Sequence, residues 1–193
     1  RWPILGLTVL FVVVMAAGGQ HLKISNDSRI FFSKDNPQLI AFEALEATYT
    51  EANTVLIAVA PKAEAGAGGI FTPDALTAIA GLTEKGWLLP YSTRVDSLTN
   101  FSHTWADEDE LIVEDLVADP ADLSLQDLAR IEKIALNETQ LVNRLVAADG
   151  RTTAVLVNFV LPDESAEAVN EISDQVKVIV VQARAQHPDL NFY

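Results

Sequence analysis

The sequence contains no cysteine, and this absence removes several chemistries at once. Without thiols the chain has no disulfide framework, no thiolate zinc site, no iron–sulfur cluster and no cysteine nucleophile. Basic residues are scarce as well, because 13 Lys and Arg stand against 27 Asp and Glu, which gives a net charge of -14. Such a chain repels a phosphate backbone and offers no basic cluster, so nucleic acid is excluded as a partner.

Recognisable catalytic and cofactor motifs are also missing. His21, His103 and His187 lie far apart in the sequence and show no metal-ligand spacing. A triad of His103 with Ser97 and an aspartate can be imagined, but no G-x-S-x-G elbow surrounds any serine. The glycines at 66–69 lack the Gly-Lys-Ser/Thr of a phosphate loop and the third Rossmann glycine, which favours a flexible connection. We therefore assign no catalytic, cofactor-binding or metal residues and expect no enzyme.

Acidic residues gather in one part of the chain. Between Val95 and Ala129 there are ten Asp and Glu and no Lys or Arg, with runs at 107–110 and 114–115. Several carboxylates can bind calcium, but neither the glycine nor the bidentate glutamate of an EF-hand loop is present. A solvated acidic face is the preferred interpretation.

What the sequence has in abundance is apolar residues, at 49%. Its 193 residues suit one globular domain with an appendage. Residues 2–19 carry no charge, and as a helix they would measure roughly 27 Å, which predicts a transmembrane helix over 1–19. Arg1 and Trp2 would lie at the cytoplasmic interface and the acidic remainder outside. A secretory signal peptide is the alternative.

Four helices are predicted after residue 19. Asn36-Pro37 and Thr72-Pro73 each place a capping side chain before a proline, which predicts helices over 37–50 and 73–87. A third helix starts at Ser124, and a fourth covers 163–187 and ends before Pro188. The predicted buried positions of the last two are Leu125, Leu128, Ile131 and Ala135, and Ala166, Val169, Ile172, Val176, Ile179, Val180 and Ala183.

The strand pattern predicts the topology. The apolar runs at 54–60 and 153–161 are typical of central strands, whereas 91–98 is interrupted by polar residues and reads as an edge strand. A fourth strand opens at 190–192. Together with the helices this is the split βαβ, or ferredoxin-like, order of an α+β fold, with the first and third strands in the middle of the sheet. Asp149-Gly150 predicts a tight turn after a short strand over 141–147.

The predicted organisation has three parts: a transmembrane helix over 1–19, a connecting segment over 20–53 that holds the helix 37–50, and a ferredoxin-like domain over 54–193. That domain carries an acidic insertion over about 100–147, and its last strand is incomplete.

Several segments resemble a known family. The pieces that carry the resemblance are Ile70-Phe71-Thr72 at a helix start, RVDSL at 94–98, DELIV at 109–113, and Asp149-Gly150 before the third strand. In this order, after one membrane helix, they resemble the first transmembrane helix and the first extracytoplasmic loop of resistance–nodulation–division (RND) superfamily transporters. The nearest branch is the hydrophobe/amphiphile exporters related to MmpL, hopanoid-transporter and Patched-like proteins.

The resemblance implies part of a proton-driven exporter of lipids or other hydrophobic molecules in the cell inner membrane, with residues after about 20 in the periplasm as a porter domain. It implies as partners the remaining transmembrane helices, a second porter domain and further copies in a homo-oligomer. The proton relay would lie on helices outside these residues. Phe71, Trp87, Phe101 and Trp105 are candidates for lining the substrate path, and the alternative is that all four belong to the core.

A different class of function remains open. A membrane-anchored extracytoplasmic binding or assembly module could use the same sheet to pair with a partner strand or to hold a small ligand, without transport. An exporter needs further apolar stretches of about 20 residues, which distinguishes the two.

Overall fold

A computed structural model describes residues 1–17, 31–49, 53–62, 69–107, 110–162 and 166–193. The chain divides into two compact units, Arg1–Tyr49 and Thr50–Tyr193. The positions of the two units relative to one another are not determined, so each is described by itself.

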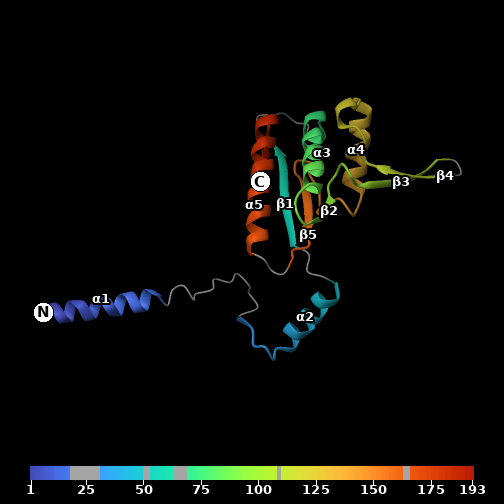
Figure 1. The fold of residues 1–193 in the computed structure, drawn as a ribbon. Coiled ribbons are helices and arrows are strands. Elements are labelled where there is room, and N and C mark those ends of the chain that lie inside the picture. Colours follow the sequence, from blue (N-terminus) through green and yellow to red (C-terminus); the bar gives the residue numbers. More distant parts are fainter. Residues whose placement is uncertain (18–30, 50–52, 63–68, 108–109, 163–165) are drawn as a thin grey trace. The chain divides into compact units, whose positions relative to one another are not determined.

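The first unit contains two helices, α1 (Trp2–Ala17) and α2 (Pro37–Tyr49) (Figure 1). The predicted membrane helix over 1–19 is thus described as 16 residues, and residues 18 and 19 lie outside the described part. In the described ranges, none of the helices combines the length and the apolar character needed to cross a membrane. Helix α2 begins at Pro37, where Asn36 accepts a hydrogen bond from the Gln38 N–H at 2.9 Å.

The second unit is built on a four-stranded antiparallel sheet, so the predicted α+β class is confirmed. Its strands are β1 (Asn53–Pro61), β2 (Ser92–Asp96), β5 (Thr153–Phe159) and β6 (Leu190–Phe192), in the order β2-β5-β1-β6. The first and third strands of this sheet therefore lie in the middle and the polar β2 lies at an edge, as the hydrophobic pattern predicted. The middle pair β1 and β5 matches Asn53 with Phe159 through Val59 with Thr153.

Helices α3 (Pro73–Trp87) and α5 (Ala166–Gln186) run side by side over one face of the sheet (Figure 1). Side chains from that face and from the helices form the core, with Phe159 and Phe192 from the strands among its largest buried members. Because alternate strand residues point to opposite faces, this packing buries Ile57 and Val59 of β1.

The caps of α3 and α4 (Leu125–Asn137) match the sequence signals. Thr72 accepts a hydrogen bond from the Ala75 N–H at 3.2 Å, and Pro73 follows it at the first helical position. Ser124, the predicted start of α4, forms a capping box with Asp127. A short 3₁₀ helix, Pro120–Asp122, precedes α4.

Three details of the sequence prediction were wrong. Leu125 is 85% exposed, because the first residue of α4 has no preceding turn to hold it against the core. Val169, in the first turn of α5, is half exposed, and the neighbouring Ala168 is buried in its place. The segment 141–147 forms turns and isolated bridges in place of a strand, and Val146 bridges both Val142 and Thr153.

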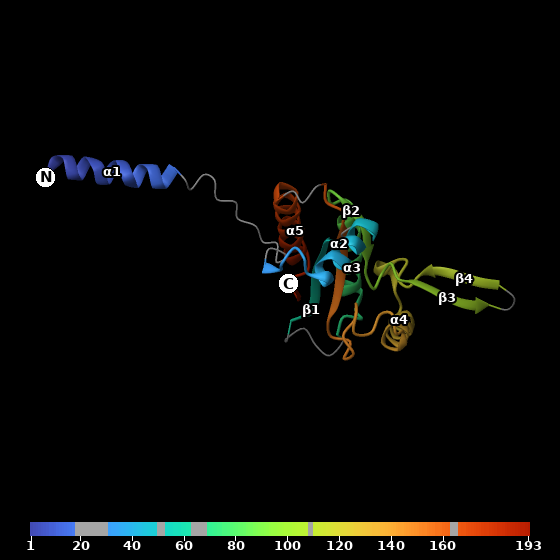
Figure 2. The same cartoon turned by 90° about the horizontal axis from the view of Figure 1, so that it is seen from below.

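The acidic insertion contains a β-hairpin that the sequence analysis did not predict. Strands β3 (Ser102–Asp107) and β4 (Glu110–Asp115) pair antiparallel, from Ser102 with Asp115 to Asp107 with Glu110. Figures 1 and 2 show this hairpin extending away from the four-stranded sheet. Glu108 and Asp109 lie outside the described residues.

Candidate functional site

The four aromatic residues proposed for a substrate path lie in different places. Phe71 is buried in the core just before α3, and Phe101 packs partly buried against the same core. Trp87 ends α3 and is 49% exposed, and Trp105 lies on β3, where it stacks on His103. Phe71 and Trp87 flank opposite ends of a 15-residue helix, so these two do not line one continuous surface.

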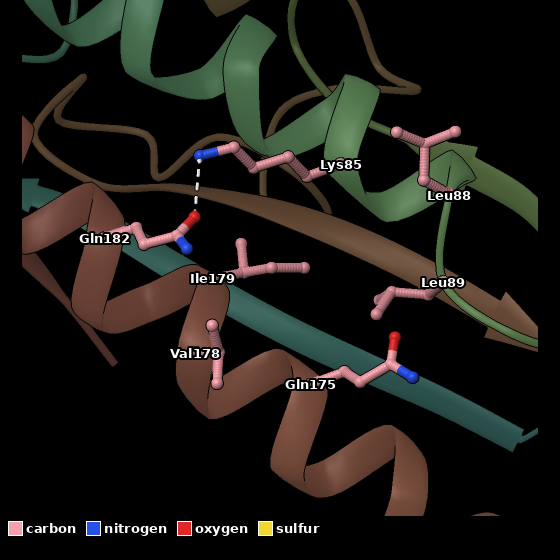
Figure 3. A pocket seen from close by; sticks show the side chains of 7 residues that line it. All are labelled: Lys85, Leu88, Leu89, Gln175, Val178, Ile179 and Gln182. Carbon is pink, nitrogen blue, oxygen red and sulfur yellow. Dashed lines mark hydrogen bonds between the residues drawn. The ribbon is translucent and has the colours of Figure 1, made fainter.

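A groove lies between the last turn of α3 and the middle of α5 (Figure 3). It has a volume of about 280 Å³. Its lining consists of Lys85, Leu88, Leu89, Gln175, Val178, Ile179 and Gln182. The groove therefore combines four aliphatic side chains with one cation and two amides.

The local sequence explains why apolar side chains of the groove remain exposed. Helix α3 ends at Trp87, and the chain then turns, with the Leu88 and Leu89 N–H groups bonded to the carbonyls of Lys85 and Gly86 at 3.1 and 3.3 Å. This turn buries Leu89 but leaves Leu88 83% exposed. On the facing helix, Val178 points away from the buried stripe and is also exposed.

Polar side chains from both helices border the groove. Lys85 donates a hydrogen bond to the side-chain oxygen of Gln182 at 3.5 Å, which connects the two helices across one end (Figure 3). Gln175 lies about two turns before Gln182 on α5, on the other side of Ile179. An acyl chain could lie on the aliphatic lining while an acidic head group contacts Lys85.

The sheet face opposite the helices is a second apolar surface. Leu56 pairs with Leu156 and Ala58 with Ala154, so these four side chains share that face. Leu56 is 54% exposed. The face is bordered on one side by Asp96, whose carboxylate accepts a hydrogen bond from the Arg94 guanidinium at 2.8 Å.

The groups considered for catalysis have structural roles in the described residues. Ser97 is buried, and its hydroxyl lies 2.9 Å from the Thr83 Oγ1, 3.0 Å from the Thr99 Oγ1 and 2.9 Å from the Asn100 Oδ1. His103 stacks on Trp105, with ring centroids 5.5 Å apart. Ser97 and His103, which the sequence suggested as triad partners, form no hydrogen bond with each other in the described part of the chain.

Two further contacts of titratable groups lie at helix ends. His187, just after α5, lies with its Nδ1 2.7 Å from the Asp74 Oδ1 at the start of α3. Hydrogen bonds from the Ser124 side chain and backbone, with a smaller contribution from the Arg130 charge, hold the pKa of Asp127 below its ordinary value. Among the residues that the structure describes, no group of three or more His, Asp or Glu side chains is arranged to hold a metal ion.

Sequence reasoning missed the groove residues Leu88 and Val178. The signal was present, because Leu88-Leu89 directly follows a helix end and Val178 stands outside the apolar spacing of α5. Only the packing of the two helices brings them together.

No protein-family model matches the chain, and no curated protein is significantly similar to it.

Proposed function

We propose that this chain is the extracytoplasmic porter part of a proton-driven RND-type exporter of lipids or other amphiphilic molecules. The observation that carries the proposal is the apolar groove between α3 and α5, with Lys85 at its edge. An aliphatic lining with one cation suits an acidic amphiphile better than a polar solute.

The topology also supports the proposal. The strand order β2-β5-β1-β6, with α3 and α5 on one face, is compatible with the ferredoxin-like porter fold that the sequence resemblance implies. In the proposed cycle this domain rocks against a second porter domain and so opens and closes the path for the substrate. The energy comes from proton transfer on helices outside these residues.

Helix α1 supports a location at the membrane. Its large apolar side chains, from Trp2 to Met15, are exposed on all sides, and its sequence has no charge. Its 16 described residues measure about 24 Å, less than the ~30 Å hydrocarbon core, so a full span requires further helical residues or a locally thinner bilayer.

The size of the native polypeptide tests the transporter proposal. An antibody raised against residues 36–193 is used on fractionated cells. We expect a band several-fold heavier than this chain that resists alkaline extraction from membranes. A band close to the size of the chain would contradict transport and favour the alternative, an anchored extracytoplasmic binding or assembly module.

Photo-crosslinking tests the groove. Membranes that hold the full protein are incubated with palmitate carrying a diazirine, illuminated, and digested for mass spectrometry. We expect labels on peptides that contain 85–89 and 175–182. Leu88→Asp should reduce this labelling severalfold, whereas Leu125→Asp, at a leucine of equal exposure outside the groove, should not. Equal losses for both variants would show that the labelling is not specific to the groove.

A further inference from the structure

The β3–β4 hairpin is a two-stranded ribbon with a well-anchored base. At the base, the Leu116 N–H donates to the Phe101 carbonyl at 2.8 Å and the Val117 N–H to the Thr99 carbonyl at 3.2 Å. Beyond these pairs the strands extend away from the core (Figure 2). Within the described residues, β3 and β4 pair only with each other, so each has one free edge.

The two faces of β4 differ in character. Leu111 and Val113 share one face and are 72% and 60% exposed. Glu110, Ile112 and Glu114 share the other, where two exposed carboxylates stand on either side of the isoleucine. Asp115, at the base of the hairpin, is exposed on the same face as Leu111 and Val113. From Glu110 to Glu114, one face of the edge is thus apolar and the other is acidic.

The apolar face is the one that nothing covers in the described part of the chain. On the acidic face, Trp105 pairs directly with Ile112 and stacks on His103, so aromatic rings cover the isoleucine. On the apolar face, the cross-strand neighbours of Leu111 and Val113 are the small side chains of Ala106 and Thr104. An exposed ribbon with an apolar face and a free edge is a template for an added strand.

We propose that the free edge of β4 binds an extended segment of a partner protein in which basic and apolar residues alternate. In an added strand, side chains point alternately to the two faces of the sheet. Apolar side chains of the partner then cover Leu111 and Val113, and its basic side chains lie beside Glu110 and Glu114. This binding is independent of the transport function proposed above.

Charge favours a basic partner segment at the free edge of β4 over a second copy of the chain or a membrane surface. A second copy of the chain carries the same net charge of -14, and between Val95 and Ala129 it has no basic side chain to place beside these carboxylates. An anionic membrane surface likewise repels the hairpin. A basic segment is attracted, and the attraction weakens with salt.

A designed peptide tests this proposal. The full chain, in nonionic detergent, is titrated into a fluorescein-labelled peptide of eight residues in which lysine and valine alternate. The control peptide has four lysines followed by four valines, so it keeps the charge and composition but not the alternation. We expect fluorescence anisotropy to show salt-sensitive binding of the alternating peptide and at least tenfold weaker binding of the control peptide.

Matched variants locate the binding. Replacing Leu111 and Val113 together by Thr keeps the preference for strand but removes the apolar surface, and should weaken binding about tenfold. Glu114→Gln should weaken it about threefold and reduce its salt dependence. Leu125→Thr and Glu132→Gln, at exposed positions on α4, should leave binding unchanged.

Three outcomes would overturn the proposal. Equal binding of the two peptides, or equal effects of the hairpin and α4 variants, would mean unspecific attraction to an acidic protein. Self-association in sedimentation that the Leu111/Val113 double variant removes would mean that a second copy covers the face. In a variant with Trp2→Phe and Trp87→Phe, Trp105 is the remaining tryptophan, and its quenching by brominated phosphatidylcholine would mean that lipid covers the hairpin.

Discussion

Gly69 and Gly150 come into close contact although 80 residues separate them in the sequence. A Cβ atom placed on Gly69 would lie 2.3 Å from the Gly150 carbonyl oxygen, and the same oxygen accepts a hydrogen bond from the Ile70 N–H at 3.0 Å. Both glycines have positive φ, 58° and 66°. The loop before α3 is therefore fixed to the turn before β5 at this point.

Gly69→Ala should destabilise the protein strongly. The methyl group clashes with a backbone oxygen, and the left-handed conformation alone costs about 1–2 kcal/mol for a residue with a Cβ. We expect a loss of at least about 2 kcal/mol in the free energy of unfolding. Urea unfolding of the full chain in nonionic detergent, followed by near-ultraviolet circular dichroism, measures it.

Gly81→Ala is the matched control, because no atom outside its own helix lies within 4 Å of a Cβ at this position in α3. Alanine is the better helix former by about 1 kcal/mol, so this variant should be as stable as the parent or more stable. Similar losses in the two variants would contradict the close approach at Gly69.

Ser97→Ala should remove a buried hydrogen-bonding hub. Its hydroxyl contacts Thr83, Thr99 and Asn100, so the variant removes one hydrogen bond from each of these three side chains. We expect a loss of about 1–3 kcal/mol in the free energy of unfolding. Ser102→Ala, at an exposed position on β3, should change it by less than about 0.5 kcal/mol. A neutral Ser97→Ala variant would mean that water replaces the hydroxyl.

Thr72→Ala should weaken the start of α3. The Thr72 hydroxyl oxygen accepts the Ala75 N–H, one of the helix donors that lacks a carbonyl partner. The expected loss is about 1 kcal/mol, measured by thermal unfolding, and Thr72→Ser should recover most of it because serine caps equally well. If serine and alanine destabilised equally, the methyl group rather than the hydroxyl would be responsible.

The pKa of Asp127 predicts a pH effect. Its lowered pKa in the folded chain means that the carboxylate contributes stability above its unfolded pKa and loses that contribution as the pH falls through the folded pKa. Ser124→Ala removes the main hydrogen bond, so the pKa of Asp127 should rise toward its ordinary value. Carboxyl carbon shifts in an NMR titration measure this rise. An unchanged titration midpoint for Asp127 would show that a group other than the Ser124 side chain lowers its pKa.

The sequence determined the local elements where a single signal was sufficient. Helix α3 has the predicted bounds because Thr72-Pro73 fixes its start. The apolar runs of β1 and β5 identified the central strands because such runs are typical of central positions in a sheet. In α4 the apolar spacing placed Leu125 in the core, but the periodicity carries no information on how far the partner surface extends.

Tertiary structure alone decided which surfaces remained exposed. The acidic composition concealed the hairpin, although the short apolar run Leu111-Ile112-Val113, with two β-branched residues, is compatible with a strand. The groove exists because α3 and α5 pack side by side on one sheet face, and the contact of Gly69 with Gly150 exists because two distant loops meet. The sequence thus determined the helices and the four strands of the main sheet with their order, since caps and periodicity act within a few residues. Only the folded chain decided the groove, the free edge of β4 and the contact between the loops, since these depend on packing between distant segments.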